Sequence, residues 1–347
     1  MKTLRFVLLP IGFFYGCIVY LHRRLYLLGI LKSFKFHIPL INVGNLSLGG
    51  TGKSPHVEYI HNIINLKLKT AIVSRGYNRK SKGVILVNPD SQVKDVGDEP
   101  IQFKYKFPDT PIIVAERRSK AIQKLVEDKT IKCILLDDAF QHWSIISSLN
   151  ILLTTYERPF FKDSVVPAGR LREFKNGYKR ANIIIVSKCP IDISEEQKTN
   201  YLEKINVFEH QKVFFSTYKY LDPYALLDPT KKIELSDLRD KSFLLVSAIA
   251  DTSYLEKYIK TKTPLYEHLK FADHHYFSKN DMKRIKQKSK DNYILTTEKD
   301  ATRLLVHKKF IINEQLKIYV LPIKVEIAFG EADIFKSYLL KQIARIC

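Results

Sequence analysis

The stretch NVGNLSLGGTGKSPH, residues 42–56, joins an apolar run to an amphipathic one through a turn rich in glycine. The run before it, FHIPLINVGN, predicts a buried strand, and PHVEYIHNIINLKL after it has apolar residues at helical spacing. A strand, a glycine loop and a helix form the setting of a phosphate-binding loop. The usual spacing G-x-x-x-x-G-K-[ST] ends here as Gly52-Lys53-Ser54, whereas Ser47 occupies the place of the first glycine.

Glycines at these positions allow the backbone N–H groups of the loop to converge on a phosphate, and a helix starting near Lys53 adds its positive end. We expect Lys53 to reach the β- and γ-phosphates of ATP, and the Ser54 hydroxyl to face Mg²⁺. An ordinary glycine turn in front of a lysine is the alternative. The predicted nucleotide-binding residues are Ser47, Gly49, Gly50, Thr51, Gly52, Lys53 and Ser54.

Short apolar runs continue along the chain and are separated by helical or turn-rich stretches. They are TAIVSRGY, TPIIVAE, CILLDDAF, LNILLTT and ANIIIVSK. This alternation predicts an α/β fold with a mostly parallel sheet flanked by helices. After about residue 206, the long strand-like segments KVFFSTYKYL and LKIYVLPIKVEI enclose a smaller unit. We expect these two segments to pair as a two-stranded connector to a second, smaller α/β domain.

The N-terminal segment Phe6–Leu21 contains 16 residues without a charge, and basic residues stand on both sides of it. A helix of that length spans about 24 Å, less than the roughly 30 Å of a bilayer core, so we expect it to embed in one leaflet. A signal peptide and a buried core helix are the alternatives. The expected organisation is a membrane-associating segment (1–31), a nucleotide-binding and catalytic domain (32–206) and a smaller domain with its ribbon linker (207–347).

Charge and cysteine content narrow the class of partner. The 347 residues carry 57 Lys plus Arg against 36 Asp plus Glu, a net charge of +21, which favours an anionic partner. Because the first acidic residue is Glu58, part of the excess lies in the apolar N-terminal segment, which points to an anionic membrane surface. The four cysteines lie far apart and suggest neither a zinc site nor a disulfide framework.

Acidic residues follow a buried run in CILLDDAFQHW. Asp137 and Asp138 come at its end, where two adjacent carboxylates repel each other unless a cation lies between them. We expect them to hold Mg²⁺ or its water ligands, with two surface aspartates at a turn as the alternative. Gln141 and His142 follow within reach of the same site and are candidates for substrate binding.

Further charged residues follow other predicted strands and loops. Arg75 comes after an apolar strand, at the sheet edge where parallel α/β proteins bind ligands, and can clamp phosphate oxygens. Asp98 is a candidate general base for an alcohol acceptor, and Glu99 beside it is a further metal candidate. For Arg75 and Asp98, a plain surface charge is the alternative. Arg170 and Arg172, in PAGRLREF, suit a second anionic group on the substrate.

Adjacent histidines occur in FADHHYFS. Neighbours in sequence face apart and no third ligand is spaced to help, so a metal site is not favoured for His274 and His275. An orienting partner for a carboxylate base fits this pair better.

The motifs VGNLSLGGTGKSP, SRGYNRK, GDEP, LLDDAFQH, LREF, FADHH and TEKDA occur in this order between residue 43 and about residue 301. In this combination the chain resembles the tetraacyldisaccharide 4'-kinase family. The resemblance implies transfer of the γ-phosphoryl group of ATP, with Mg²⁺, to the 4'-hydroxyl of an acylated glucosamine disaccharide 1-phosphate. It also implies action at the cytoplasmic face of the bacterial inner membrane.

The same resemblance implies roles for individual residues. Ser47 matches a phosphate loop that begins with Ser or Thr, Asp98 matches the base, and Asp137 with Asp138 matches the paired acidic residues. His274 matches the assisting histidine, although His275 adjoins it. We also expect Lys53 and Arg75 to be catalytic residues. The protein is expected to be a monomer that binds no nucleic acid. Departures from the family pattern are Asn78, a residue that tolerates positive φ, together with Ala139 and Phe174.

Two other classes of function remain open at this point. A GTPase of the metal-insertion type could share the glycine loop and the acidic strand end, but SKCP at residues 187–190 lacks the aspartate that reads guanine. A basic nucleic-acid-binding ATPase would account for the net charge, but no recognition module is visible.

Overall fold

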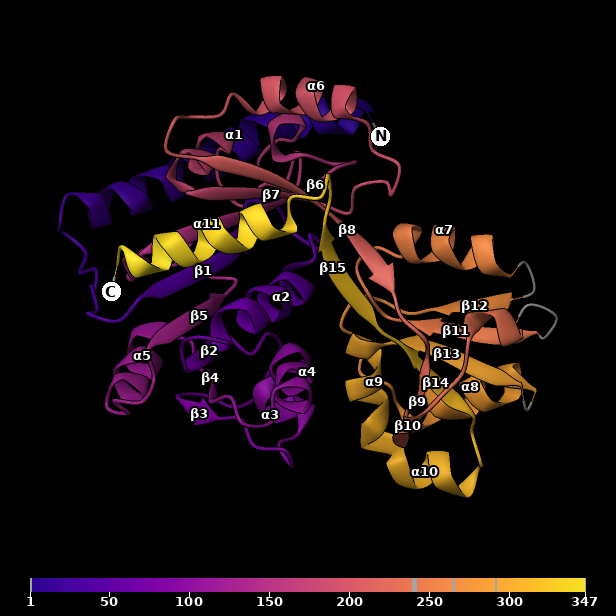
Figure 1. Ribbon diagram of the computed structural model, residues 1–347. Helices are drawn as coiled ribbons and strands as arrows, with labels where there is room; N and C mark the ends of the chain where they lie inside the picture. The colour runs from indigo at the N-terminus through magenta and orange to yellow at the C-terminus, as the bar shows by residue number, and fades with distance from the viewer. Residues whose placement is uncertain (1, 239–241, 264–265, 291, 347) are drawn as a thin grey trace.

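The computed structural model describes residues 2–238, 242–263, 266–290 and 292–346, which form two α/β units, each built on one β-sheet (Figure 1). The first sheet has the strand order β15-β8-β7-β6-β1-β5-β2-β4-β3. Its interior strands run parallel, and only β3 and β15 at the edges run antiparallel to their neighbours. The strands are β1 Leu40–Asn45, β2 Thr70–Ser74, β3 Ile85–Leu86, β4 Ile112–Val114, β5 Cys133–Asp137, β6 Leu149–Thr155, β7 Ile183–Ser187, β8 Lys212–Tyr220 and β15 Ile323–Ile327.

Helices cover both faces of this sheet. On one face, α2 (Lys53–Asn65), α4 (Asp98–Lys106) and α11 (Ala332–Ala344) pack in one buried cluster with alternate residues of β1. The opposite face carries α5 (Arg118–Val126) and α6 (Glu195–Ile205). Because both faces are covered, every residue of β1 is buried, as expected for an interior strand of a parallel sheet. The mostly parallel α/β fold predicted from the apolar runs is therefore confirmed.

The second unit is smaller. Its sheet has the order β10-β9-β14-β13-β11-β12, with parallel pairing from β14 to β12. The strands are β9 Tyr224–Ala225, β10 Asp228–Lys232, β11 Phe243–Ser247, β12 Tyr266–Lys270, β13 Tyr293–Thr297 and β14 Ile318–Leu321. Its helices are α7 Ser253–Lys262, α8 Lys279–Ser289, α9 Glu298–Leu304 and α10 Lys308–Asn313. The first unit also contains the short helix α3 (Val93–Val96), and four 3₁₀ turns occupy 160–162, 175–180, 235–238 and 305–307.

Two antiparallel strands connect the units, as predicted. β8 pairs with β15 from Tyr220↔Ile323 to Ser216↔Ile327. The sequence segment LKIYVLPIKVEI, however, is not one long strand. It splits at Pro322 into β14 of the second sheet and β15 of the first, because proline has no N–H for a ladder and a fixed φ.

The last helix returns to the first unit. Phe335, Leu339 and Ile343 of α11 are buried in the same cluster as the core of β1 and α2, and Figure 1 shows α11 lying beside the first sheet. Residues 207–347 therefore do not pack as one block, since β8, β15 and α11 belong to the first sheet and its cover.

The N-terminal helix α1 spans Lys2–Leu27 and is longer than the charge-free stretch that predicted it. Within the described ranges, Phe6–Leu27 is the one segment whose length and apolar composition would suffice to cross a membrane, and little of it is buried. At 1.5 Å per residue these 22 residues span about 33 Å, longer than the charge-free stretch because the helix continues through Arg23 and Arg24.

Two glycines dock α1 on the first unit. A Cβ at Gly12 would stand 2.8 Å from the Val165 carbonyl oxygen, and one at Gly16 would stand 2.5 Å from the ring of Phe174. Phe13 adds a ring contact with Phe174 at 5.9 Å between centroids. Phe174, a departure from the family pattern, thus forms part of the seat of α1. The outward face of the helix is apolar, and Phe14 there is 68% exposed.

Candidate active site

A cleft of about 900 Å³ lies between the loop edge of the first sheet and the second unit. β1 and β5 are parallel neighbours with Val43 opposite Asp137, so the glycine loop after β1 and the acidic end of β5 meet at this edge. The cleft is lined by most of the predicted site residues: Gly49, Gly50, Thr51, Gly52, Lys53, Ser54, Arg75, Glu99, Asp137, Asp138, Gln141, His142, Arg172 and His274. The predicted residues outside the lining are Ser47, Asp98 and Arg170.

Hydrogen bonds to neighbouring strands and to the segment around Arg170 hold the glycine loop in place. Asn45 donates to the Thr51 hydroxyl at 2.7 Å, Ser187 donates to the Thr51 carbonyl at 2.8 Å, and the Leu48 N–H donates to the Arg170 carbonyl at 2.7 Å. Gly49 and Gly52 have φ of 85° and 80°, which non-glycine residues rarely adopt. Helix α2 begins directly after Gly52, so its positive end faces the cleft.

Asp138 is held by two cations. Arg172 donates to both carboxylate oxygens at 2.8 and 3.0 Å, and Lys53 Nζ lies 3.5 Å away. Burial would raise the pKa of Asp138, but Lys53 and Arg172 outweigh it and lower that pKa to about 2. The Arg172 guanidinium, expected to bind substrate, therefore already has a partner within the protein.

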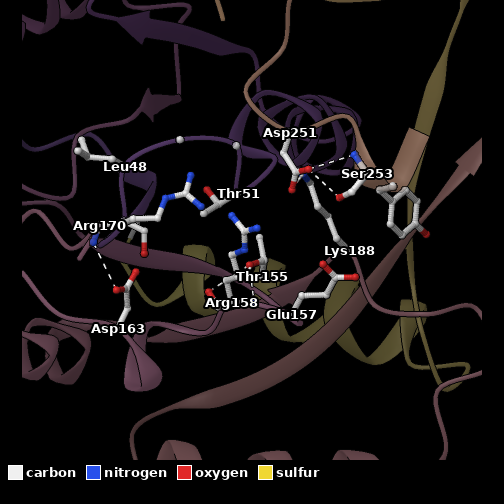
Figure 2. Close-up of a pocket in the computed structure, with 14 residues that line it drawn as sticks. Leu48, Thr51, Thr155, Glu157, Arg158, Asp163, Arg170, Lys188, Asp251 and Ser253 are labelled. Carbon is white, nitrogen blue, oxygen red and sulfur yellow. Dashed lines mark hydrogen bonds and ion pairs between the residues drawn. The ribbon is translucent and has the colours of Figure 1, made fainter. Parts of the chain in front are cut away.

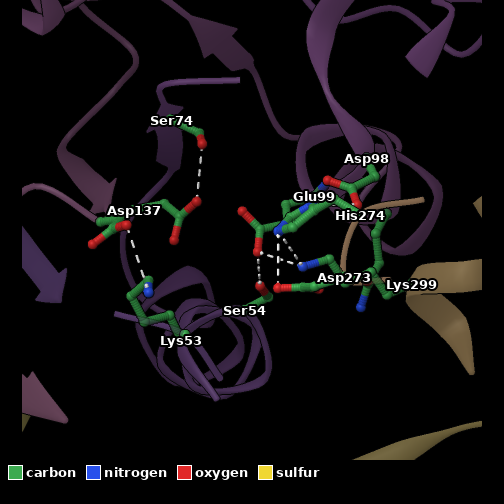
Figure 3. Close-up of polar contacts among 12 residues, drawn as sticks. Lys53, Ser54, Ser74, Asp98, Glu99, Asp137, Asp273, His274 and Lys299 are labelled. Atoms are coloured by element: carbon green, nitrogen blue, oxygen red, sulfur yellow. Dashed lines mark hydrogen bonds and ion pairs between the residues drawn. The ribbon is translucent and has the colours of Figure 1, made fainter. Parts of the chain in front are cut away.

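Asp137 has a different environment (Figure 3). Burial, followed by repulsion from Glu99 and Asp138, raises the pKa of Asp137 to about 7. Ser74 donates to its Oδ2 at 2.9 Å, while its buried Oδ1 has no hydrogen-bond partner in the part of the chain that the structure describes. Ser54, nearby in the lining, donates to Glu99 Oε1 at 3.0 Å. This corner of the cleft thus presents acidic oxygen atoms and one unused acceptor.

The predicted base and its assistant meet across the two units (Figure 3). Asp98 is the first residue of α4, and its Oδ2 lies 3.0 Å from Nδ1 of His274, which follows β12 with φ of 57°. Burial would raise the pKa of Asp98, but His274 and the cations Lys299 and Arg303 lower it to about 2. His275 instead contacts Asp281 at the start of α8, so the adjoining histidine is not the one at the base.

Lys299 contacts His274 at Nε2, the ring nitrogen that does not face Asp98. Its Nζ lies 3.2 Å from His274 Nε2 and 3.3 Å from Glu99 Oε1. The neighbouring carboxylates hold the pKa of Lys299 above its usual value against the effect of burial, so an ammonium faces the ring. An ammonium only donates, so its contact with Nε2 fits the tautomer whose Nδ1–H donates to Asp98; Asp273 Oδ2 also lies 3.8 Å from Nε2.

The other expected substrate residues occupy two places. Gln141 donates to the Asn45 carbonyl and to Glu173, both at 2.9 Å. Arg75 is exposed in the cleft, whereas burial, with Arg118 and then Arg75, lowers the pKa of His142 to about 4. Arg170 and Ser47 line a smaller pocket that adjoins the cleft along the loop, where Lys188 lies 3.8 Å from Asp251 (Figure 2).

Sequence reasoning missed four cations at this site: Lys299, Arg118, Arg303 and Lys188. Arg118, 5% exposed, lines the cleft and follows β4 as Arg75 follows β2, so the rule that pointed to Arg75 would also have found it. Lys299 stands in the quoted TEKDA motif, but its partners come from distant segments. Arg303, 3.6 Å from Asp98, is one turn further along α9.

The model of the family Tetraacyldisaccharide-1-P 4'-kinase matches residues 4–344, nearly the whole chain. The chain belongs to this family. The tetraacyldisaccharide 4'-kinase of Bacteroides thetaiotaomicron is 40% identical over 350 residues, covering 96% of this chain and 92% of that one. That of Flavobacterium johnsoniae is 39% identical over 325 residues, covering 93% of each.

Solved structures agree with this family relation. A crystal structure of LpxK from Aquifex aeolicus in complex with ATP has a TM-score of 0.74 and 27% identity, covering 99% of both chains. The 4'-kinase family relation confirms the expected enzyme class, an ATP-dependent kinase of lipid A biosynthesis. It gives no support to the GTPase or the nucleic-acid-binding ATPase.

Proposed function

We propose that the cleft between the units is the active site in which this 4'-kinase phosphorylates the 4'-hydroxyl of a tetraacyldisaccharide 1-phosphate. The observation that carries the proposal is the Asp98–His274 pair: His274 lines the same cleft as Lys53 and the acidic end of β5, and the buried Asp98 bonds to His274 from behind. A base facing a phosphate loop is the arrangement that phosphoryl transfer to an alcohol requires.

ATP would occupy the glycine loop. The backbone of Gly49, Gly50, Thr51 and Gly52 and the start of α2 would hold its phosphates, as the loop geometry and the anchored Thr51 support. Lys53 would then exchange its contact with Asp138 for the β- and γ-phosphates. Ser47 begins the loop and would shape it where it lines the smaller pocket.

Mg²⁺ is the metal that this reaction implies, and the residues present fit it. The unused Oδ1 of Asp137, the carboxylates of Asp138 and Glu99, and the Ser54 hydroxyl would hold the ion or its waters. When bound, Mg²⁺ supplies positive charge at the transferred phosphoryl group. Among the described residues no group of three or more His, Cys, Asp or Glu side chains is placed to hold a metal ion on its own.

The acceptor would enter from the side of α1. Tyr15, Val19 and His22 of that helix line the same cleft as Arg75 and His142. The Asp98–His274 pair would take the proton of the 4'-hydroxyl, and Arg75 would stabilise the transferred charge. Gln141, His142, Arg170 and Arg172 are the proposed acceptor contacts, with Arg172 first releasing Asp138.

Binding as a monomer, peripheral or monotopic, at the cytoplasmic face of the inner membrane is part of the proposal, and the apolar outward face of α1 supports its membrane contact. We divide the chain into α1, a catalytic unit that includes β8, β15 and α11, and an inserted unit from about residue 221 to residue 322.

One assay tests the proposal: labelled ATP, Mg²⁺ and disaccharide 1-phosphate lipid in detergent micelles, analysed for a lipid that carries a second phosphate. Wild-type protein should form it from ATP far faster than from GTP. An Asp98→Asn variant that binds ATP normally should form almost none. Product formation by that variant at the wild-type rate would refute the proposed site.

A further inference from the structure

Tyr218 of β8 carries a buried hydroxyl at the point where the connector touches the phosphate loop. Its residue is 6% exposed, and the hydroxyl has no hydrogen-bond partner anywhere in the described ranges. An ideal Cβ built on Gly52 would lie 1.8 Å from that oxygen, so the hydroxyl rests directly on the last glycine of the loop. Buried polar groups without partners are rare in native proteins and need an explanation.

The polar groups around Tyr218 are satisfied. His56 donates from Nδ1 to the Gly52 carbonyl at 2.7 Å and accepts at Nε2 from the Ser216 hydroxyl at 2.9 Å. Tyr254 pairs its hydroxyl with Thr217 at 2.8 Å. Ser216 and Tyr218 are two residues apart on β8 and so point to the same side of the strand, toward the first turn of α2. The Tyr218 hydroxyl is therefore the exception in an otherwise paired contact.

An acceptor bound in the cleft can supply the missing partner. Tyr218 lines the cleft together with Gly52, Lys53 and Ser54. Burial raises the pKa of Tyr218, so its hydroxyl keeps its proton at neutral pH and can donate. Phosphoryl oxygens carry negative charge and only accept, which makes a phenol beside this loop a matching donor.

We propose that Tyr218 is a nucleotide-binding residue whose hydroxyl donates a hydrogen bond to a phosphoryl oxygen of ATP held in the glycine loop. The inference deepens the proposed function and rests on ATP occupying that loop. It places a nucleotide contact on β8, the strand that leads into the second unit, so bound ATP would contact the connector directly.

The variant Tyr218→Phe tests this with Tyr220→Phe as its matched control. Tyr220 lies on the same strand and lines the same cleft, but its ring stacks on Tyr258 at 4.0 Å. Calorimetry should show the Kd for ATP and for ADP raised about tenfold or more by Tyr218→Phe, and left within about twofold by Tyr220→Phe. The ligand-free Tm of Tyr218→Phe should equal or exceed that of wild type, because no protein partner is lost and an unpaired buried hydroxyl is removed.

Three results would overturn the proposal: a wild-type Kd for ATP in Tyr218→Phe, a lower ligand-free Tm, or adenosine binding weakened as much as ATP binding. The second would assign the hydroxyl to the ribbon, and the third would assign it to the base or ribose. Wild-type protein that binds no ATP would instead refute the occupied loop on which the proposed function depends.

Discussion

Asp98 Oδ2 and His274 Nδ1 lie 3.0 Å apart although 176 residues separate them in the chain. Asp98 belongs to α4 of the first unit and His274 follows the edge strand β12 of the second. The two groups meet only when the units approach each other, and Lys299, 3.3 Å from Glu99, is a second contact between the units at the same place. The proposed base is therefore completed by the arrangement of the units, not by either unit alone.

We predict that Asp98 and His274 act as one group. Asp98→Asn and His274→Ala should each lower kcat by about 10²-fold or more, and the double variant should lose little beyond the larger single effect. The Kd for ATP should stay near that of wild type. His275→Ala is the control, because His275 points to Asp281 and should keep normal turnover. Fully additive losses in the double variant would show that the two residues work independently.

Asp137→Asn should increase the Mg²⁺ concentration needed for half-maximal activity by about tenfold or more, because it weakens a ligand whose Oδ1 is unused by the described protein. A Mg²⁺ titration at saturating ATP measures the effect, and chelation of the metal should abolish activity in both proteins. Asp128→Asn, at an exposed turn, is the charge-matched control. An unchanged Mg²⁺ dependence in Asp137→Asn would remove this carboxylate from the metal site.

The double substitution Gly12→Val and Gly16→Val should detach α1, because added side chains would meet the Val165 carbonyl and the ring of Phe174. We expect faster proteolysis between residues 28 and 37, with the first unit still folded. Ile11→Val, on the exposed face, should leave cleavage unchanged.

Deletion of residues 1–31 should remove binding of the protein to anionic vesicles. Vesicle binding at the wild-type level would contradict a membrane role for α1.

The pH dependence of stability should change in His61→Phe. Burial lowers the pKa of His61 from 6.5 to about 4, so the unfolded chain takes up its proton first. The contribution of the neutral His61 to the free energy of unfolding is complete above pH 6.5 and is lost as the pH falls toward 4. The free energy of unfolding of His61→Phe, measured in urea, should therefore rise by about 1–3 kcal/mol relative to that of wild type between pH 7 and pH 4. A constant difference across that range would contradict the shift.

Several features of the fold and site were readable from sequence because they depend on local patterns. The glycine loop, the apolar strands and the acidic end of β5 each lie within one short segment, and parallel strands bring such ends to one edge of a sheet. Asn78 has the positive φ that was expected to be tolerable there. The pairing of β8 with β15 also followed from two long alternating runs.

Other features depend on contacts between distant segments. Nothing near Lys299 indicates that its ammonium lies between Glu99 and His274. Whether the run through Pro322 makes one strand or two depends on which sheet accepts each half. Likewise, the apolar face of α11 could have covered either sheet. It packs on the first sheet, whose core residues on that face it buries.

The return of the chain through β15 to α11 has a consequence for how the protein is made. Residues 323–344 leave the ribosome after the inserted unit, and they complete the edge of the first sheet and bury part of its core. The inserted unit can therefore fold on the nascent chain before the catalytic unit is closed. Until these residues emerge, one face of the first sheet lacks the part of its cover that α11 supplies, and the apolar core there is open to aggregation.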